Sequence, residues 1–292
     1  MIKGPNTISK IKIVECPRDA MQGWKDWIPT ELKISYLNQL LQVGFDTLDF
    51  GSFVSEKAIP QLRDTATVLN GLDLSGSTTK LLAIVANTRG AIEAASHKFI
   101  SCIGFPFSIS ETFQLRNTHK TIAASTETTK EIVDICSGSG KEPVIYISMG
   151  FGNPYGDPYN EEIVFEWVDK LIEMNIGIIS IADTVGLANP NQIQSILSKL
   201  ILKYPHVEIG VHLHSTFETQ QEKIVAALQA GCIRFDGALK GIGGCPMADD
   251  ELVGNINTEE LIRVLNKYDK MPLINEEALN KSLVMAGDLF HT

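Results

Sequence analysis

Segments of strand character alternate with helical segments along almost the whole 292-residue chain, and this alternation restricts the fold more than any other feature. Apolar runs rich in β-branched residues predict eight strands, and amphipathic stretches predict a helix after each of them. Strands that alternate with helices form a parallel sheet, and eight such units favour a closed (β/α)8 barrel. The strands are expected at 11–15, 46–50, 80–86, 98–103, 143–149, 177–182, 207–212 and 233–236, and the helices at 30–43, 56–70, 88–96, 118–137, 160–175, 189–203, 217–230 and 258–268.

An open, doubly wound sheet is the alternative fold. Its usual Gly-x-Gly-x-x-Gly phosphate loop is absent after the first predicted strand. The length suits either two average domains or one barrel of about 250 residues. Because no linker rich in Pro, Gly or Ser divides the chain, we expect a single α/β domain over 1–292. It would be a TIM barrel over about 10–270 with an added C-terminal helical segment over about 271–292.

Composition argues against several classes of partner. A formal net charge of −10 disfavours nucleic acid and acidic membrane surfaces, because both would repel the protein. No run approaches the roughly 18 apolar residues of a membrane helix, and Met1–Ser9 lacks a long apolar core, so we expect no membrane partner and a cytoplasmic protein. Five cysteines without a C-x-x-C pair do not suggest a disulfide framework. Cys102, Cys136 and Cys232 are expected to pack in the core.

Polar residues recur where the predicted strands end. In a TIM barrel the carboxyl ends of all strands meet at one face, and this face carries the catalytic groups. The chain therefore places a whole set of candidate site residues on one rim. They are Arg18 and Asp19 after the first strand, Asp49 at the end of the second, Asp183 after the sixth, His212 and His214 at the end of the seventh, and Cys245 and Asn255 in the loop after the eighth.

The pair His212 and His214 is the most informative of these features. Alternate residues of a strand point to the same side, so the two imidazoles can bind one metal ion from the end of the strand. An H-x-H pair also occurs on polar strand faces that bind no metal. Together with the other polar residues on the same rim, the pair favours a metal-assisted enzyme that acts on carbon–carbon bonds.

Six short motifs, taken in order, resemble those of the hydroxymethylglutaryl-CoA lyases, a branch of the TIM-barrel metallolyases and Claisen condensing enzymes. The Pro-Arg-Asp and His-x-His elements are shared across this wider group. The Gly-x-Gly-Gly-Cys-Pro loop, combined with Ser-Phe-Val-Ser after the second strand, is closer to the lyase branch. The resemblance covers about 10–270. The motifs are ECPRDAMQ at 15–22, SFVS at 52–55, DTVG at 183–186, HLH at 212–214, GIGGCP at 241–246 and GN at 254–255.

The resemblance implies cleavage of 3-hydroxy-3-methylglutaryl-CoA to acetyl-CoA and acetoacetate with a divalent ion, magnesium or manganese. It assigns the metal ligands to Asp19, His212, His214 and Asn255. This mixed oxygen and nitrogen set suits Mg²⁺ or Mn²⁺ better than structural zinc, which favours thiolates. The expected partner is a small acyl-CoA substrate. Barrels of this kind often pair, so a homodimer or higher homo-oligomer is also expected.

Catalytic roles follow from the same resemblance. Arg18 is always charged and would stabilise the developing enolate oxygen. Cys245, on a glycine-rich loop, would protonate the enolate carbon as a general acid. His214 would assist proton transfer as well as bind metal. Asp49 and Asp183 complete the expected catalytic set, although Asp183 has an alternative role as a cap of the following helix.

Four further polar residues are expected to bind substrate. Gln22 ends the first motif. Lys25 aligns with a lysine of the lyases that could meet an anionic part of the thioester, and a solvated loop lysine is the alternative. Ser180 and Thr184 flank the end of the sixth strand, where their hydroxyls could donate hydrogen bonds to a substrate carboxylate.

The chain departs from the lyase pattern at three places. Asp49 stands where the family usually has glutamate, Ala20-Met21 replaces Gly-Leu, and 215–217 reads Ser-Thr-Phe in place of Asp-Thr-Tyr. The metal ligands are unaffected, but an altered acyl group is an alternative. The rival interpretations are a 4-hydroxy-2-oxoacid aldolase, a Claisen condensing synthase, and a catalytically weak barrel that only binds metal and acyl-CoA.

Overall fold

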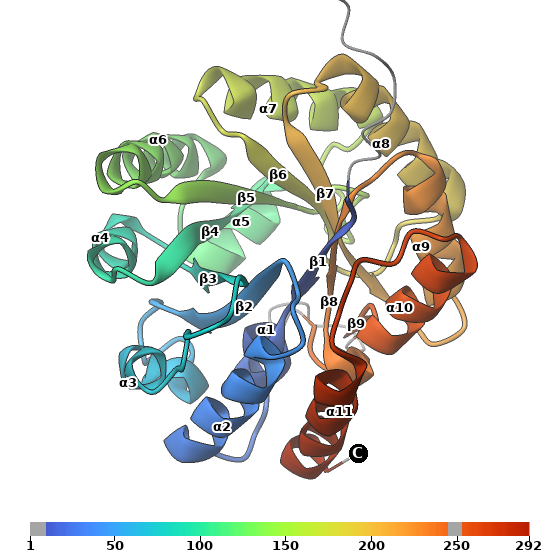
Figure 1. The fold of residues 1–292 in the computed structure, drawn as a ribbon. Helices are drawn as coiled ribbons and strands as arrows, with labels where there is room; N and C mark the ends of the chain where they lie inside the picture. Colours follow the sequence, from blue (N-terminus) through green and yellow to red (C-terminus); the bar gives the residue numbers. More distant parts are fainter. Residues whose placement is uncertain (1–9, 245–252, 292) are drawn as a thin grey trace, which may run out of the picture.

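A closed barrel of parallel strands forms the centre of the computed structural model, which describes residues 10–244 and 253–291 (Figure 1). The ring closes because β6 pairs with β7 as well as with β5, and β1 pairs with both β2 and β8. The predicted (β/α)8 barrel is therefore confirmed. A further short strand, β9, pairs antiparallel with β7. The strands are β1 (Lys12–Glu15), β2 (Thr47–Ser52), β3 (Lys80–Ile84), β4 (Ile100–Ser108), β5 (Glu142–Ser148), β6 (Ile178–Asp183), β7 (Glu208–Ser215), β8 (Arg234–Gly237) and β9 (Gly254–Asn255).

Helices surround the barrel and cover its outer face (Figure 1). The predicted helix over 118–137 is wrong at its start. His119 takes a left-handed φ of 56° that ends one helix, and the Thr121 side chain caps the next. The helices are α1 (Pro17–Gln22), α2 (Thr30–Leu41), α3 (Thr65–Asn70), α4 (Thr88–Ser96), α5 (Glu111–Thr118), α6 (Ile122–Ser139), α7 (Glu161–Glu173), α8 (Pro190–Lys203), α9 (Gln220–Gln229), α10 (Thr258–Lys267) and α11 (Glu276–Phe290), with 3₁₀ turns η1 (Pro60–Leu62) and η2 (Leu239–Gly241).

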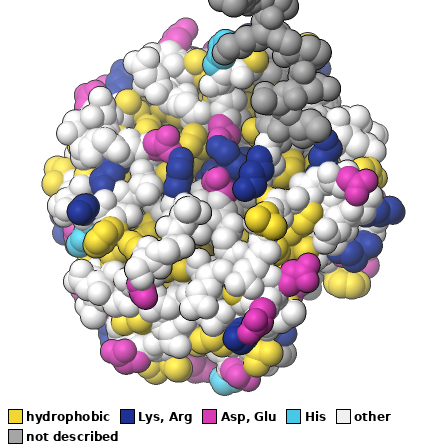
Figure 2. Space-filling view, viewed as in Figure 1, with side chains coloured by type: hydrophobic (Ala, Val, Ile, Leu, Met, Phe, Trp, Pro, Cys, Tyr) yellow, Lys and Arg dark blue, Asp and Glu magenta, His cyan; other side chains and the backbone are white. Residues whose placement is uncertain are grey.

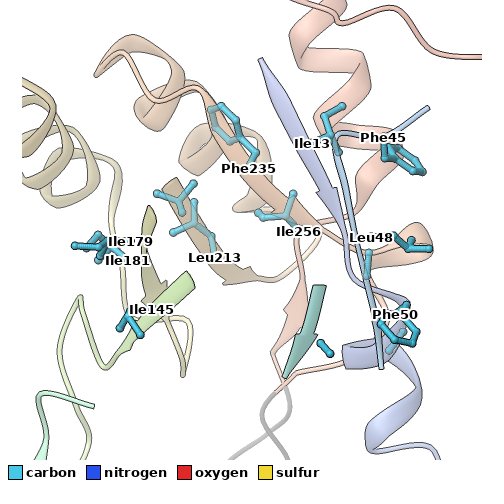
Figure 3. Packing of buried hydrophobic residues seen from close by; sticks show 14 of the residues in the cluster. Ile13, Phe45, Leu48, Phe50, Ile145, Ile179, Ile181, Leu213, Phe235 and Ile256 are labelled. Carbon is cyan, nitrogen blue, oxygen red and sulfur yellow. The ribbon is translucent and has the colours of Figure 1, made fainter. Parts of the chain in front are cut away.

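The main hydrophobic core lies between the barrel and its helices. Outward-facing strand residues such as Ile13, Leu48 and Phe235 are buried there (Figure 3). Cys136 and Cys232 are buried in the same core, while Cys102 packs with a smaller apolar cluster inside the barrel. The prediction that these three cysteines are packing residues is confirmed.

Charged side chains occupy the barrel at the amino ends of its strands. Glu208, at the start of β7, accepts from Lys12 of β1 and from Arg234 Nη1 of β8, the latter at 3.0 Å. Lys80 Nζ donates to Glu142 at 2.8 Å across the same end. Figure 2 shows basic and acidic side chains gathered near the middle of the molecule's face. This end is closed by ion pairs, so the functional cavity lies at the other end of the barrel.

The added C-terminal segment forms the helix α11, as predicted, and it packs beside α2 (Figure 1). The Phe290 ring contacts Trp24 edge-on, with ring centroids 5.3 Å apart, and also meets Tyr36. The backbone N–H of Asn275 donates to the carbonyl of Val43 at 2.8 Å. These contacts make α11 part of the outer helical layer. Among the described helices, none has the length and apolar character needed to cross a membrane.

Candidate active site

A cavity of about 490 Å³ opens at the carboxyl ends of the strands. Its inner wall comes from α1 and from strands β3 to β7. Its outer walls come from the segment after β2 and from the end of α5 with the turn that follows it. The inner wall therefore coincides with the rim that the sequence predicted. The predicted site residues that line the cavity are Arg18, Asp19, Gln22, Thr184, His212 and His214.

Asp19, His212 and His214 form a compact group of potential metal ligands, with one ligand atom from each lying within 4.8 Å of the others. His214 Nδ1 lies 2.9 Å from the carbonyl oxygen of Thr184. Since a carbonyl can only accept, Nδ1 carries the proton and Nε2 is left with a free lone pair. Nε2 is buried and has no hydrogen-bond partner among the described residues. A metal ion would satisfy this atom, so the donor set fits the expected divalent ion.

Asp19 is held on both of its carboxylate oxygens. Oδ1 accepts from Arg18 Nη1 and from Gln22 Nε2, each at 2.7 Å, and Oδ2 accepts from Asn255 Nδ2 at 2.7 Å. Burial raises the pKa of Asp19, but the charges of Arg18 and the neighbouring imidazoles outweigh burial and keep the pKa below its ordinary value. The Asp19 carboxylate is therefore ionised at neutral pH, as a metal ligand must be.

Asn255 lies beside this group because β9 pairs with β7, in a register that sets Asn255 opposite His214. Its amide nitrogen, not its oxygen, faces Asp19. Its Nδ2 also donates to the carbonyl of Ile242 at 2.9 Å. Ligation through the oxygen would require the amide to turn over. Gly243, with φ of 107°, lets the loop backbone lie close to the Asn255 amide, since a Cβ at this position would lie 2.5 Å from Asn255 Nδ2.

Asp49 accepts hydrogen bonds from Arg18 through both of its carboxylate oxygens. Arg18 Nε lies 3.2 Å from Oδ1 and 3.0 Å from Oδ2, and Nη2 lies 2.5 Å from Oδ2. Burial raises the pKa of Asp49 to about 6 although the Arg18 charge opposes the rise. The register of β2 shifts directly after Asp49, between it and Gly51, as in a β-bulge. The aspartate that replaces the family's usual glutamate therefore still reaches the arginine.

Asp183 does not line the cavity. Its Oδ2 accepts from Lys223 Nζ at 2.7 Å, and its Oδ1 accepts from the backbone N–H of Ala188 at 3.0 Å. Lys223 also donates to the carbonyl of His214 at 2.8 Å. The alternative role of Asp183 as a helix cap is wrong, because Asn189 caps α8 with its own side chain. The structure shows Asp183 in a buried ion pair that joins the ends of β6 and β7.

Other predicted residues are dispersed. Thr184 lines the cavity, and its hydroxyl accepts from the backbone N–H of Met149 at 2.8 Å. Ser180 is fully buried below the cavity, and among the described residues its hydroxyl has no hydrogen-bond partner. Lys25 is exposed and does not line the cavity. Cys245 lies outside the described residues, so its predicted role as a general acid stays a prediction.

Sequence reasoning missed three residues around the histidines. Asp236 Oδ2 lies 3.1 Å from His212 Nδ1, and the Tyr146 ring meets the His212 ring edge-on at a centroid distance of 5.8 Å. Lys223 approaches from α9. Side chains alternate between the two faces of a strand, and this alternation along β8 places Asp236 inside the barrel. Asp236 could therefore have been predicted from the sequence. No local pattern marks Lys223, whose partners lie about 40 and 9 residues away.

Comparison with known proteins identifies relatives over nearly the whole chain. The family model described as HMGL-like matches residues 10–284. The hydroxymethylglutaryl-CoA lyase YngG of Bacillus subtilis is 35% identical over 261 residues, which is 89% of this chain and 86% of that protein. The cytoplasmic 3-hydroxy-3-methylglutaryl-CoA lyase of Rattus norvegicus is 32% identical over 257 residues, covering 88% of this chain and 74% of the relative.

Solved structures agree with these sequence matches. An HMG-CoA lyase from Acinetobacter baumannii, in complex with coenzyme A and 3-methylmalate, superposes with a TM-score of 0.90 at 31% identity, covering 99% of this chain and 93% of that one. The Bacillus subtilis HMG-CoA lyase superposes with a TM-score of 0.89 at 33% identity, covering 97% and 94%. The cavity residues thus lie in a fold that these enzymes share from end to end, and the chain belongs to the HMGL-like family.

Proposed function

We propose that this protein is a divalent-metal-dependent lyase that cleaves 3-hydroxy-3-methylglutaryl-CoA to acetyl-CoA and acetoacetate. The observation that carries the proposal is the group formed by Asp19, His212 and His214 beside the Arg18–Asp49 pair, all at one end of the barrel. Membership of the HMGL-like family and the names of the relatives support the same reaction.

Asp19, His212 and His214 would hold the ion, and Asn255 would join them through its amide oxygen. One carboxylate with imidazoles and a carboxamide suits Mg²⁺ or Mn²⁺. When bound, the divalent ion would supply a Lewis acid that makes the C3 hydroxyl proton of the substrate easier to remove. The buried, unpartnered Nε2 of His214 supports this assignment.

Arg18 would stabilise the charge that develops in the reaction. The C3 hydroxyl proton would pass to a base at the site, the role that the sequence predicts for His214, and the C2–C3 bond would then break. C3 becomes the ketone carbon of acetoacetate, and the electron pair passes to an enolate of acetyl-CoA. The described contacts of Arg18 use four of its five N–H groups, which leaves one at Nη2 for the enolate oxygen. Asp49 holds the guanidinium plane in place.

The enolate carbon must then take up a proton, and Cys245 is our proposed donor. Gly244, the residue before it, donates its backbone N–H to Asp19 Oδ2 at 3.3 Å. This contact ties the start of the glycine-rich loop to the proposed metal site. Both Gly243 and Gly244 have positive φ values, of 107° and 131°, which glycine adopts without strain.

The acyl-CoA would enter between the two outer walls of the cavity. One wall contains Val54, Ser55 and Ile59 after β2, and the other contains 117–120 at the end of α5 and in the turn that follows it. The first wall is mainly apolar and would pack against the thioester arm, whereas Lys120 offers a cation on the second. Gln22 and Thr184 are the substrate-binding residues that line the cavity. Coenzyme A in the Acinetobacter baumannii relative supports an acyl-CoA ligand.

The residues that line the cavity give no support to the remaining expectations. Substrate binding by Lys25 and Ser180 and a catalytic role for Asp183 stay predictions. So do the homo-oligomer and the cytoplasmic location. The Asp49–Arg18 contact is kept despite the shorter side chain, so we do not invoke another acyl group.

A substrate panel tests the proposed reaction. Purified protein with Mn²⁺ is incubated with 3-hydroxy-3-methylglutaryl-CoA, 3-hydroxybutyryl-CoA or 4-hydroxy-2-oxovalerate, and the products are identified by mass spectrometry. We expect acetyl-CoA and acetoacetate in equal amounts from the first compound only. Cleavage of the oxoacid alone would establish the aldolase instead.

A further inference from the structure

Asp236, on β8, contacts His212 of the neighbouring strand β7. The two residues are opposite each other in the parallel pairing of β7 and β8, so both side chains point into the barrel. The Asp236 side chain is fully buried, and its Oδ2 lies 3.1 Å from His212 Nδ1. The contact is therefore shielded from water, where a charge-assisted hydrogen bond is strongest.

This contact decides which nitrogen of His212 faces the proposed metal site. A carboxylate oxygen accepts hydrogen bonds, so Nδ1 donates to Asp236, and in the neutral imidazole Nε2 then presents its lone pair. His214 is oriented in the same way by the carbonyl of Thr184. Both imidazoles thus use Nδ1 for a hydrogen bond, each with a different acceptor, and leave Nε2 available to an ion.

Arg234 is a buried cation beside Asp236 on β8. It lies two residues earlier on β8, pointing to the same side, and it is 1% exposed. Burial lowers the pKa of Arg234, but Asp236 is the strongest of the acidic neighbours that raise the pKa above its ordinary value. Asp236 Oδ1 and Arg234 Nε and Nη2 have no hydrogen-bond partner in the described part of the chain, so charge and not a direct bond links the two.

We propose that Asp236 is a positioning residue for the metal site, which holds His212 in the tautomer and orientation that present Nε2 to an ion bound by Asp19 and His214. This inference rests on the proposed metal site. Carboxylates that orient a ligating histidine in this way typically change metal affinity by about 10- to 100-fold when removed.

A second arrangement around the same histidine must be distinguished. Cys16, His212 and Asp236 also offer ligand atoms within 4.8 Å of one another, so an ion there would take Nδ1 and displace the hydrogen bond. The Cys16 thiol instead lies 3.7 Å from the carbonyl of Val14, to which it donates. A Cys16→Ser variant separates the two arrangements, because only the second uses the sulfur.

The test measures Mn²⁺ binding to metal-free protein by electron paramagnetic resonance of the free ion, without any substrate. Asp236→Ala and Asp236→Asn should raise the Mn²⁺ Kd by about 10- to 100-fold. The matched control is Asp64→Asn, which breaks the ion pair with Lys33 (2.7 Å) outside the cavity and should leave the Kd within about twofold. Cys16→Ser should also leave the Kd unchanged.

Nitrogen-15 spectra of the metal-free protein supply a second readout that a merely structural role would not move. Recorded at a pH at which the His212 imidazole is neutral, they should place its proton on Nδ1 in the wild type and in Asp64→Asn, and shift it toward Nε2 in the Asp236 variants. An unchanged Kd in both Asp236 variants would overturn the inference alone. Loss of binding in Cys16→Ser would put the ion in the other group and overturn it as well. A wild-type protein that binds no Mn²⁺ would overturn the metal site together with the inference.

Discussion

Replacement of Lys223 by methionine tests whether Asp183 is an anchor of the barrel rim. The Lys223 and Asp183 side chains are 4% and 1% exposed, and their charged atoms are 2.7 Å apart. Methionine has a similar length but removes the cation, so the Asp183 carboxylate would be left buried with only the backbone N–H of Ala188 as donor. The carbonyls of Gly186 and His214 would lose the donor that they share.

The size of the effect follows from this burial. Removing one partner of a buried ion pair typically costs about 3–5 kcal/mol, because the other charge remains without compensation. For a chain of this size about 1 kcal/mol lowers Tm by roughly 2–4 °C, so the fall in Tm should be on the order of 10 °C. The matched control is Lys281→Met on α11, whose partner Glu277 is exposed and whose loss should cost no more than about 0.5 kcal/mol.

Urea unfolding of the metal-free proteins, followed by circular dichroism, measures both variants. We expect a large loss of unfolding free energy for Lys223→Met and almost none for Lys281→Met. A loss below about 1 kcal/mol for Lys223→Met would refute the anchoring role and return Asp183 to the candidates for catalysis.

Three further predictions address the site and its surroundings. Burial raises the pKa of Glu15 from 4.5 to about 8, so the folded state holds this proton more tightly than the unfolded state, and the unfolding free energy falls as pH rises through this window. Glu15→Gln should reduce the fall that urea unfolding measures between pH 5 and pH 8. An equal fall in both proteins would contradict the assignment. Gly243→Ala would place a Cβ 2.5 Å from Asn255 Nδ2 and 2.9 Å from the carbonyl oxygen of Asp19. We therefore expect an Mn²⁺ affinity at least tenfold weaker, with an unchanged circular dichroism spectrum. Wild-type affinity would count against the close contact. Cys245→Ala should keep Mn²⁺ affinity while lowering kcat by about 10²–10⁴, and a wild-type kcat would remove this thiol from the mechanism.

Much of the fold could be predicted because its pattern is local and repeated. Eight apolar runs followed by amphipathic stretches require only neighbouring residues to be recognised, and each predicted strand overlaps an observed one. The start of the predicted helix over 118–137 was wrong because α5 ends at a left-handed His119, where the sequence has no glycine to signal a helix end. Helix α1 was missed because six residues are too few to show a helical period.

The site was partly predictable for a related reason. Residues at strand ends converge in a barrel, so Asp19, His212 and His214 could be expected to meet. Asp183 also sits at a strand end, but it follows Ala182, which lines the cavity, so its side chain points the other way, toward Lys223 of α9. Contacts between distant elements leave no spacing in the sequence, and this explains why Lys223 was not predicted.

The most direct test of the central claim is a titration of metal-free protein with Mn²⁺, in which acetoacetate release from 3-hydroxy-3-methylglutaryl-CoA and metal occupancy are measured on the same samples. We predict that activity is absent without metal and rises in proportion to occupancy of one site. We also predict that His214→Ala neither binds Mn²⁺ nor turns over substrate. Full occupancy without acetoacetate release, or undiminished release in the presence of a chelator, would contradict the account.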